Sequence, residues 1–174
     1  MIKITTPLTE AVRTRLKCGE EVLFSGSVYT ARDAAHKKLA HLIASKEELP
    51  INLQDEVIYY AGPTPCRKDG VFGSCGPTTS SRMDDFSVLL MEKGITGMIG
   101  KGRRSPEVIS SIKKYKAVYF LTIGGAGAYL AKKIKKVELA AFEDLGPEAI
   151  YRLELEDFPL IVGVDSQGNS IYPV

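Results

Sequence analysis

Cysteine is scarce in this chain, whose 174 residues include only Cys18, Cys66 and Cys75. No two of them form a CxxC pair, and an odd number of widely spaced cysteines argues against a disulfide framework. A four-cysteine zinc or iron–sulfur site needs one ligand more than the chain has. We therefore predict that this chain holds no metal cluster by itself.

Long apolar runs and a strong charge of one sign are also lacking. No apolar run approaches the roughly 20 residues that cross a bilayer, and residues 1–5 show no basic region followed by an apolar one. A net charge of +2 is too mild to indicate nucleic-acid binding. We expect a cytoplasmic protein that binds neither membrane nor nucleic acid.

Size and composition predict one compact domain over residues 1–174. Hydrophobic residues make up 44% and charged residues 25%, as in soluble globular proteins, and no repeat or low-complexity segment is visible. Strand-like runs alternate with helix-like ones, which is typical of an α/β domain. Strands are predicted at 3–5, 21–28, 57–61, 97–99, 117–123, 137–142 and 160–164, and helices at 9–16, from 30, from 81, from 105, at 128–134 and at 147–152.

The stretch 76–84, Gly-Pro-Thr-Thr-Ser-Ser-Arg-Met-Asp, combines a rigid turn with four hydroxyls and an arginine. Its proline fixes φ, and its glycine allows a tight turn. Ser81-x-x-Asp84 resembles a capping box before apolar residues at helical spacing, so Arg82 is predicted in the first turn of a helix. Hydroxyls, a guanidinium and a helix N-terminus together suit a carboxylate or phosphate, although a well-capped helix without a ligand needs many of the same residues.

Two further basic residues occupy similar places. Arg32 follows a predicted strand where Thr-x-x-Asp at 30–33 offers a helix cap, and Lys101 lies in the turn after another strand. Open α/β sheets bind ligands at such strand ends. We therefore predict that Arg32, Arg82 and Lys101 hold a small dicarboxylate, the arginines bidentately and the lysine as a point charge. His36, one turn after Arg32, is interpreted as a packed or solvent-facing residue.

Two glycine-rich stretches do not match known phosphate-binding motifs. Before Lys101, Ile95 stands where the Walker pattern needs glycine, and Gly102 replaces the serine or threonine that would hold magnesium. The stretch 124–127 lacks the third glycine of a dinucleotide fingerprint, so it predicts close backbone packing. The loop at 64–75 is open to two interpretations, a cover over a site or an ordinary surface hairpin.

Five blocks, in a fixed order, span nearly the whole chain. They are FSGSVYTARDAAH at 24–36, YAGP at 60–63, GSCGPTTSSRMD at 73–84, GMIGKG at 97–102 and EDFP at 156–159. Together they resemble the beta subunit, or C-terminal domain, of class I iron–sulfur-dependent fumarases and of the related tartrate dehydratases. Ser81 departs from the pattern, because the family commonly has glycine there. The resemblance implies a single swivelling β/β/α domain with a mixed sheet and flanking helices.

The resemblance also implies an activity that one chain cannot perform alone. It implies the beta subunit of a hydro-lyase that interconverts (S)-malate and fumarate in an alpha2beta2 assembly. A four-iron four-sulfur cluster would be held by three cysteines of the alpha subunit and would act as a Lewis acid on the C2 hydroxyl. This fits the small number of cysteines in the present chain.

Five residues face the substrate according to the resemblance, namely Arg32, Thr78, Thr79, Arg82 and Lys101. Loss of a proton from C3 spreads charge into the adjacent carboxylate, so fixed cations stabilise the transition state more than the ground state. This role is assigned mainly to Arg32 and Arg82. The expected base is Thr78, which needs cations or a relay to an alpha-subunit carboxylate because a free alcohol is too weak a base. Thr79 is expected to bind or position the substrate.

Three other interpretations stay open at this point. The chain could be the beta subunit of L-tartrate dehydratase or of another 2-hydroxydicarboxylate hydratase, which shares the same motifs. It could be a non-catalytic anion-binding or regulatory module, in which the same cations hold an anion without chemistry. It could also be a purely structural subunit with well-capped helices.

Overall fold

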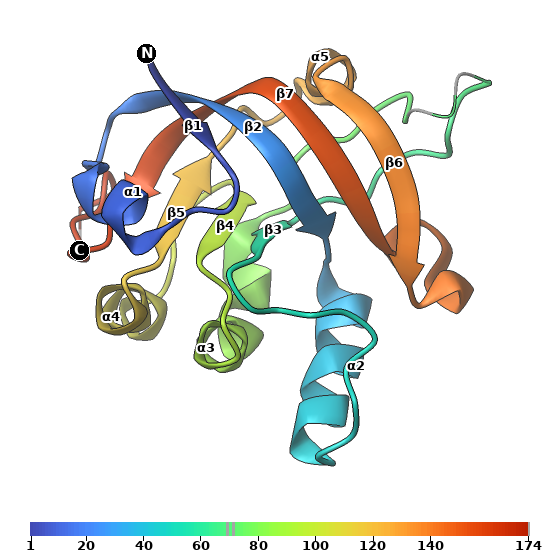
Figure 1. The fold of residues 1–174 in the computed structure, drawn as a ribbon, viewed down its shortest axis with the longest axis horizontal. Helices are drawn as coiled ribbons and strands as arrows, with labels where there is room; N and C mark the ends of the chain where they lie inside the picture. The colour runs from blue at the N-terminus through green and yellow to red at the C-terminus, as the bar shows by residue number, and fades with distance from the viewer. Residues whose placement is uncertain (69, 71, 174) are drawn as a thin grey trace.

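The computed structural model describes residues 1–68, 70 and 72–173, and these form three layers (Figure 1). Three long curved strands and the short β1 make the first layer, short strands the second, and helices the third. The first layer contains β1 (Ile2–Thr5), β2 (Glu21–Thr30), β6 (Ile134–Ala141) and β7 (Ile150–Val164). The second contains β3 (Val57–Tyr59), β4 (Gly97–Gly100) and β5 (Val118–Leu121). The third contains α2 (Asp33–Ala44), α3 (Asp84–Glu92) and α4 (Pro106–Tyr115), while the short helices α1 (Glu10–Arg15) and α5 (Gly127–Ala131) lie beside the strands.

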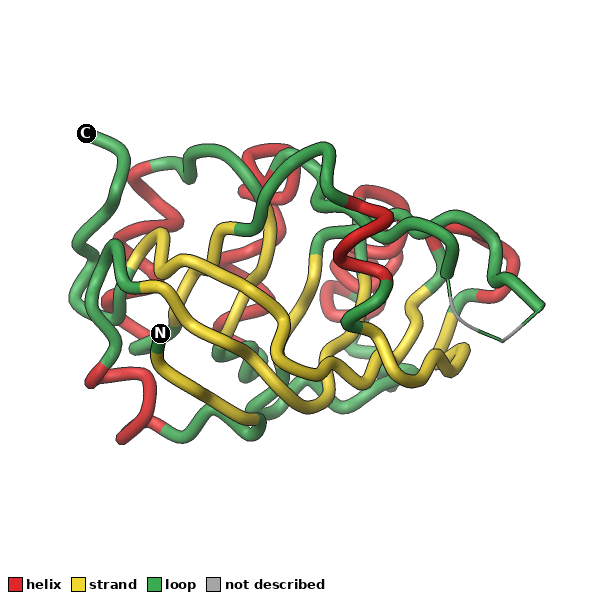
Figure 2. Tube along the Cα trace, turned by 90° about the horizontal axis from the view of Figure 1, so that it is seen from above, coloured by secondary structure: helices red, strands yellow, loops and turns green. Residues whose placement is uncertain are grey.

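The strands form one mixed sheet in the order β1-β2-β3-β4-β5-β7-β6, with β2 also paired to β7. Strands β2 to β5 run parallel, and β7 runs antiparallel to both β5 and β2. These pairings join β2, β3, β4, β5 and β7 into a closed ring. Seen from above, the strands cross the middle of the molecule (Figure 2). The predicted mixed sheet with flanking helices is therefore confirmed.

Two groups of buried apolar side chains hold the layers together. The first fills the space between the strand layers, where the Phe24 and Phe120 rings meet edge to face with centroids 6.1 Å apart. The second packs the helices on the short strands and includes Leu39, Leu90 and Ile112. Because the short parallel strands are covered on both faces, they consist of continuous apolar runs, as the sequence indicated for 117–123. No helix in the described part of the chain is long and apolar enough to cross a membrane.

Local sequence signals explain several helix ends. The hydroxyl of Ser105 accepts from the backbone N–H of Val108 at 3.3 Å, and Pro106 follows it, so α4 begins as predicted. Thr9 caps α1 in the same way. Gly94 has φ +112 after the end of α3, which a residue with a side chain rarely adopts.

Two helix predictions near the C-terminus differ from the structure. The predicted helix at 147–152 is wrong, because a 3-10 helix ends at Glu148 and residues from Ile150 onward belong to β7. Their backbone groups pair with β6 and β2, so nonlocal hydrogen bonds decide the conformation. The helix predicted at 128–134 ends at Ala131, and Ile134 already pairs in β6.

The loop at 64–75 forms a hairpin that projects from the body of the molecule (Figure 1). The Thr64 N–H donates to the Ser74 carbonyl at 3.0 Å, and Cys66 pairs with Phe72. Phe72 is buried and packs edge to face on Tyr151, with ring centroids 5.2 Å apart. The loop therefore has the form of a surface hairpin. Asp69 and Val71, within this loop, lie outside the described residues.

Candidate functional site

The C-terminal ends of β3 and β4 place the predicted site segments side by side. The N–H of Thr78 donates to the carbonyl of Tyr60 at 2.6 Å, just after β3. Thr79 pairs with Lys101 in a parallel bridge, just after β4. The threonine pair is therefore inserted between the ends of two parallel strands of the mixed sheet. Lys101 lies beside this pair, at the end of β4. The sequence had also placed Lys101 at the end of a strand.

Arg32 lies at the end of β2, immediately before α2. Its Nε is 3.5 Å from Glu148 Oε1 and 3.7 Å from Asp33 Oδ2, and the side chain is 28% exposed. This Nε is buried and has no hydrogen-bond partner among the described residues. The guanidinium packs on Gly62, where an added Cβ would lie 2.3 Å from Nη1. A glycine at this position therefore makes room for the arginine.

Arg82 is joined to the same carboxylate. Its Nε and Nη2 donate to the two carboxylate oxygens of Asp33 at 3.1 and 2.8 Å, a bidentate pair between the segment before α3 and the start of α2. The Arg82 side chain is half exposed. Asp33 therefore holds Arg82 by two hydrogen bonds and also lies within ion-pair distance of Arg32. The Thr-x-x-Asp pattern at 30–33 indicated only a helix-capping role for Asp33.

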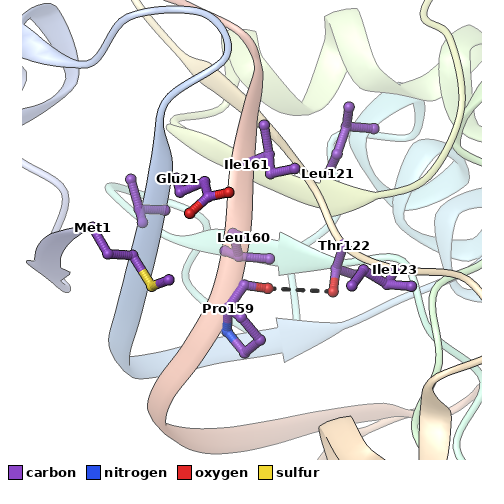
Figure 3. A pocket seen from close by; sticks show the side chains of 9 residues that line it. Met1, Glu21, Leu121, Thr122, Ile123, Pro159, Leu160 and Ile161 are labelled. Carbon is purple, nitrogen blue, oxygen red and sulfur yellow. Dashed lines mark hydrogen bonds between the residues drawn. The ribbon is translucent and has the colours of Figure 1, made fainter.

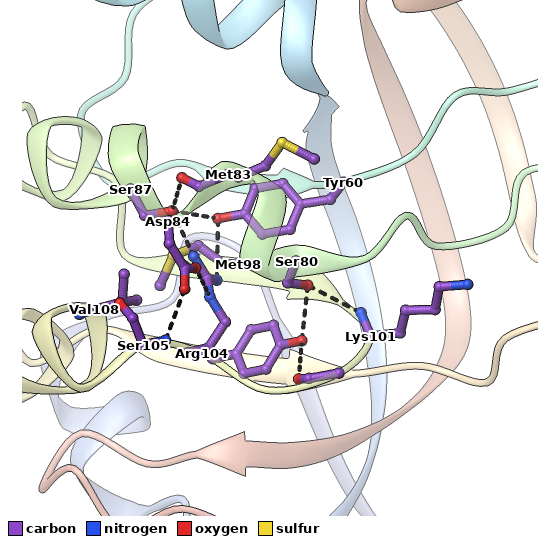
Figure 4. Close-up of polar contacts among 12 residues, drawn as sticks. Tyr60, Ser80, Met83, Asp84, Ser87, Met98, Lys101, Arg104, Ser105 and Val108 are labelled. Atoms are coloured by element: carbon purple, nitrogen blue, oxygen red, sulfur yellow. Dashed lines mark hydrogen bonds and ion pairs between the residues drawn. The ribbon is translucent and has the colours of Figure 1, made fainter.

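Lys101 and the two threonine hydroxyls carry the free polar groups of this region. No carboxylate among the described residues lies within 4.0 Å of the Lys101 ammonium. In the same part of the structure, neither threonine hydroxyl has a hydrogen-bond partner; Thr78 is half-buried and Thr79 is exposed. The Lys101 side chain extends away from the buried contacts around it (Figure 4). These groups are available to an anion that approaches the strand ends.

Both predicted helix caps at the site are wrong. The Thr30 hydroxyl accepts from the Tyr151 N–H at 3.1 Å, and Arg32 itself is the residue before the first turn of α2. The Asp84 carboxylate accepts from the Ser105 N–H and from Arg104, both at 2.7 Å, and none of the described side chains caps α3. Arg82 lies in a one-turn 3-10 helix, Ser80–Met83, that leads into α3. Distant partners have replaced the local hydrogen bonds.

His36 holds the backbone of Arg32. It is fully buried, its Nδ1 lies 2.8 Å from the Arg32 carbonyl oxygen, and its ring packs on Tyr60 and Phe86. We assign the proton to Nδ1 because a carbonyl only accepts. Burial, together with the charge of Arg104, lowers the pKa of His36 from 6.5 to about 4, so the ring is neutral at pH 7.

This buried histidine predicts a pH dependence of stability. The unfolded chain takes up the proton near pH 6.5 and the folded one only near pH 4, so stability is complete above pH 6.5 and falls as the pH drops towards 4. We expect the free energy of unfolding to fall by about 2 kcal/mol between pH 7 and pH 5 because of His36 alone. His36→Phe should remove that slope in urea unfolding. His41→Gln, which changes the exposed histidine, should keep it; parallel curves for all three chains would contradict the assignment.

An apolar pocket lies elsewhere on the molecule (Figure 3). It is lined by Met1, Glu21, Val22, Leu121, Thr122, Ile123, Pro159, Leu160 and Ile161. None of the five predicted site residues belongs to it. Its lining is almost entirely apolar, so it offers a dicarboxylate no counter-charge.

The three cysteines do not fit an iron–sulfur cluster. Cys66 is exposed, Cys18 is partly exposed and Cys75 is buried, and all three are free. Burial raises the pKa of the Cys75 thiol to about 12, which disfavours the thiolate that a metal needs. The described residues include no group of three or more histidine, cysteine or acidic side chains that could hold a metal ion.

Several known proteins are similar in sequence to this chain. A provisionally named L(+)-tartrate dehydratase subunit beta from Methanocaldococcus jannaschii is 41% identical over 171 residues, covering 95% of this chain and 88% of that protein. Fumarate hydratase class I, anaerobic, from Escherichia coli is 42% identical, covering 85% of this chain and 27% of that enzyme. Fumarate hydratase 2 from Leishmania major is 40% identical, covering 88% of this chain and 28% of that enzyme. The chain thus spans little more than a quarter of these fumarate hydratases.

The family model described as the fumarase C-terminus matches residues 1–174, the full chain. Identity of about 40% extends over most of the chain in several relatives. Together with the arginines, threonines and lysine at the strand ends, these matches show that the chain belongs to the fumarase C-terminus family.

Proposed function

We propose that this chain is the beta subunit of an iron–sulfur hydro-lyase that interconverts (S)-malate and fumarate. The observation that carries the proposal is the gathering of Arg32, Thr78, Thr79, Arg82 and Lys101 at the ends of adjacent strands. Three cations, together with two hydroxyls that have no partner in the described part of the chain, suit a small dicarboxylate. The family membership supports the same reaction class.

The charges of the site explain why the chain would need a partner. Arg32 and Arg82 share Asp33, and Arg32 also lies near Glu148. Three cations against two carboxylates leave a net charge of about +1, which is weak for a substrate that carries two negative charges. The arginines are thereby held in place before the substrate arrives, so little reorganisation is needed. Lys101 supplies the charge that no carboxylate in the described residues balances.

We propose that Thr78 is the base that removes the proton from C3 of malate. Once it leaves, the negative charge spreads into the neighbouring carboxylate, where the fixed guanidinium groups stabilise it. The Thr78 backbone is fixed by its hydrogen bond to Tyr60, which leaves only the side-chain rotation to be set. An alcohol needs help to act as a base near pH 7, so we propose a relay to a carboxylate of the partner. Thr79 would position the substrate.

The iron–sulfur cluster would belong to the alpha subunit. The present chain offers one buried, one exposed and one partly exposed cysteine, which do not fit such a cluster. One relative is named as a subunit beta, which supports an alpha partner, and we propose an alpha2beta2 assembly in the cytoplasm.

L-Tartrate is the second candidate substrate. The match covers 88% of the relative from Methanocaldococcus jannaschii, which carries a tartrate dehydratase name. The fumarate hydratases are much longer than this chain. The same cations would hold either dicarboxylate, so the five residues do not separate the two. A regulatory module that binds an anion without chemistry would also use these cations but would not need Thr78.

The test is an assay of this chain with and without its alpha subunit. We expect the anaerobic complex to dehydrate malate, with tartrate turned over more slowly, and the lone chain to be inactive. Thr78→Val should lower turnover at least about 100-fold, because it removes the proposed base and keeps the shape. Thr64→Val, in the hairpin, is the matched control and should stay within about twofold. Malate dehydration by the lone chain without iron would refute the proposal.

A further inference from the structure

A buried polar network lies between the site and α3 (Figure 4). At its centre is Arg104, whose side chain is 0% exposed. Its guanidinium lies between the rings of Tyr60 and Tyr119, with its carbon 5.2 and 4.9 Å from their centroids. Its Nη2 donates to Ser87 Oγ at 2.5 Å. The site residues themselves are not part of this contact.

Tyr119 connects this buried centre to the site. Its hydroxyl lies 2.8 Å from Ser80 Oγ and 2.9 Å from the Gly102 carbonyl oxygen. Ser80 in turn holds both backbone groups of Lys101: its Oγ accepts from the Lys101 N–H at 3.1 Å, and its N–H donates to the Lys101 carbonyl at 2.9 Å. The contacts thus fix the backbone of the candidate lysine and of Gly102, the residue after it.

The fit around Ser80 leaves no room for adjustment. An added Cβ on Gly100 would lie 2.0 Å from Ser80 Oγ and 2.9 Å from Tyr60 Cδ2. Ser80 is fully buried, and Tyr119 is 1% exposed. Burial raises the pKa of Tyr119 well above its ordinary value, so the hydroxyl stays protonated and can donate.

We propose that Tyr119 is a positioning residue for the anion site: its hydroxyl, held beside Arg104, fixes Ser80 and Gly102 and thereby the position of Lys101. The inference rests on the proposed function only in giving Lys101 a substrate to bind. Tyr119 itself does not touch the substrate. It acts through the backbone, which sets where the lysine side chain begins.

The experiment is a double-mutant cycle in the complex with the alpha subunit. Tyr119→Phe keeps the ring against Arg104 and removes only the hydroxyl. We expect it to lower kcat/KM for malate about tenfold, and less than about twofold when Lys101→Ala is already present. If Tyr119→Phe lowered kcat/KM by the same factor with and without Lys101→Ala, the proposal would be overturned. Lys101→Ala with full turnover would instead refute the proposed role of the lysine, which is a separate failure.

Amide hydrogen exchange tests the positioning without any turnover. The matched control is Tyr59→Phe, because Tyr59 is also buried and its hydroxyl donates to the Cys75 carbonyl at 2.7 Å. Both variants should lose similar thermal stability. Tyr119→Phe should speed exchange of the Lys101 N–H about tenfold, whereas Tyr59→Phe should leave it within about twofold. An unchanged Lys101 exchange rate in Tyr119→Phe would overturn the proposal whatever the enzyme activity.

Discussion

Arg82→Ala in the complex with the alpha subunit is expected to lower kcat for malate dehydration by about 100- to 1,000-fold. A guanidinium has five N–H donors, and two of those of Arg82 go to Asp33, which leaves three for a substrate carboxylate. Because negative charge grows on that carboxylate as the C3 proton leaves, the loss should appear in kcat and not only in KM.

Two further variants separate geometry from charge at this position. Arg82→Lys keeps the charge but loses the planar fork that binds Asp33 bidentately while leaving donors for a substrate carboxylate, so an intermediate loss is expected. As a control, Arg103→Ala removes an exposed arginine that stacks on Tyr172, and should change kcat by less than about twofold. If Arg82→Ala kept nearly full turnover in an intact complex, the chain would be a structural or regulatory subunit.

Arg104→Met should have the largest effect on stability, a loss of about 3 to 5 kcal/mol in the free energy of unfolding. Arg104 is fully buried and Asp84 is 12% exposed, with Arg104 Nε 2.7 Å from Asp84 Oδ1. Burial alone would lower the pKa of Arg104, but Tyr60, Asp84 and Tyr119 raise it, so the side chain stays charged. Its removal leaves a poorly solvated carboxylate without its cation. Urea unfolding at pH 7 measures the loss.

The control is an ion pair of similar length on the surface. Lys136 Nζ lies 2.6 Å from Glu138 Oε1, but both side chains are more than half exposed. Lys136→Met should therefore cost less than about 1 kcal/mol. Adding Asp84→Asn to Arg104→Met should recover part of the loss, because the uncompensated charge is gone. Equal losses for the buried and surface pairs would show that the Arg104 network contributes little.

Local signals in the sequence predicted those parts of the fold that depend on neighbouring residues. The start of α4 follows from Ser105 and Pro106, whose effects reach only one turn. Apolar runs marked the short strands because these are covered on both faces. The start of β7 was missed, since Ile150 and its neighbours become a strand only through pairing with β6 and β2. The cap at Thr30 failed for the same reason: its hydroxyl bonds a residue 121 positions away.

The α/β class and the candidate cations and hydroxyls were predictable from residue types at strand-to-helix junctions, and the family from the five sequence blocks. Only the tertiary structure decided how those groups are held. It brought Asp33 against both arginines, and it left Lys101 without a carboxylate partner in the described residues. It also placed Tyr119 and Arg104 behind Ser80. These contacts join residues far apart in the chain, and their geometry depends on parallel strands that end at the same edge of one sheet.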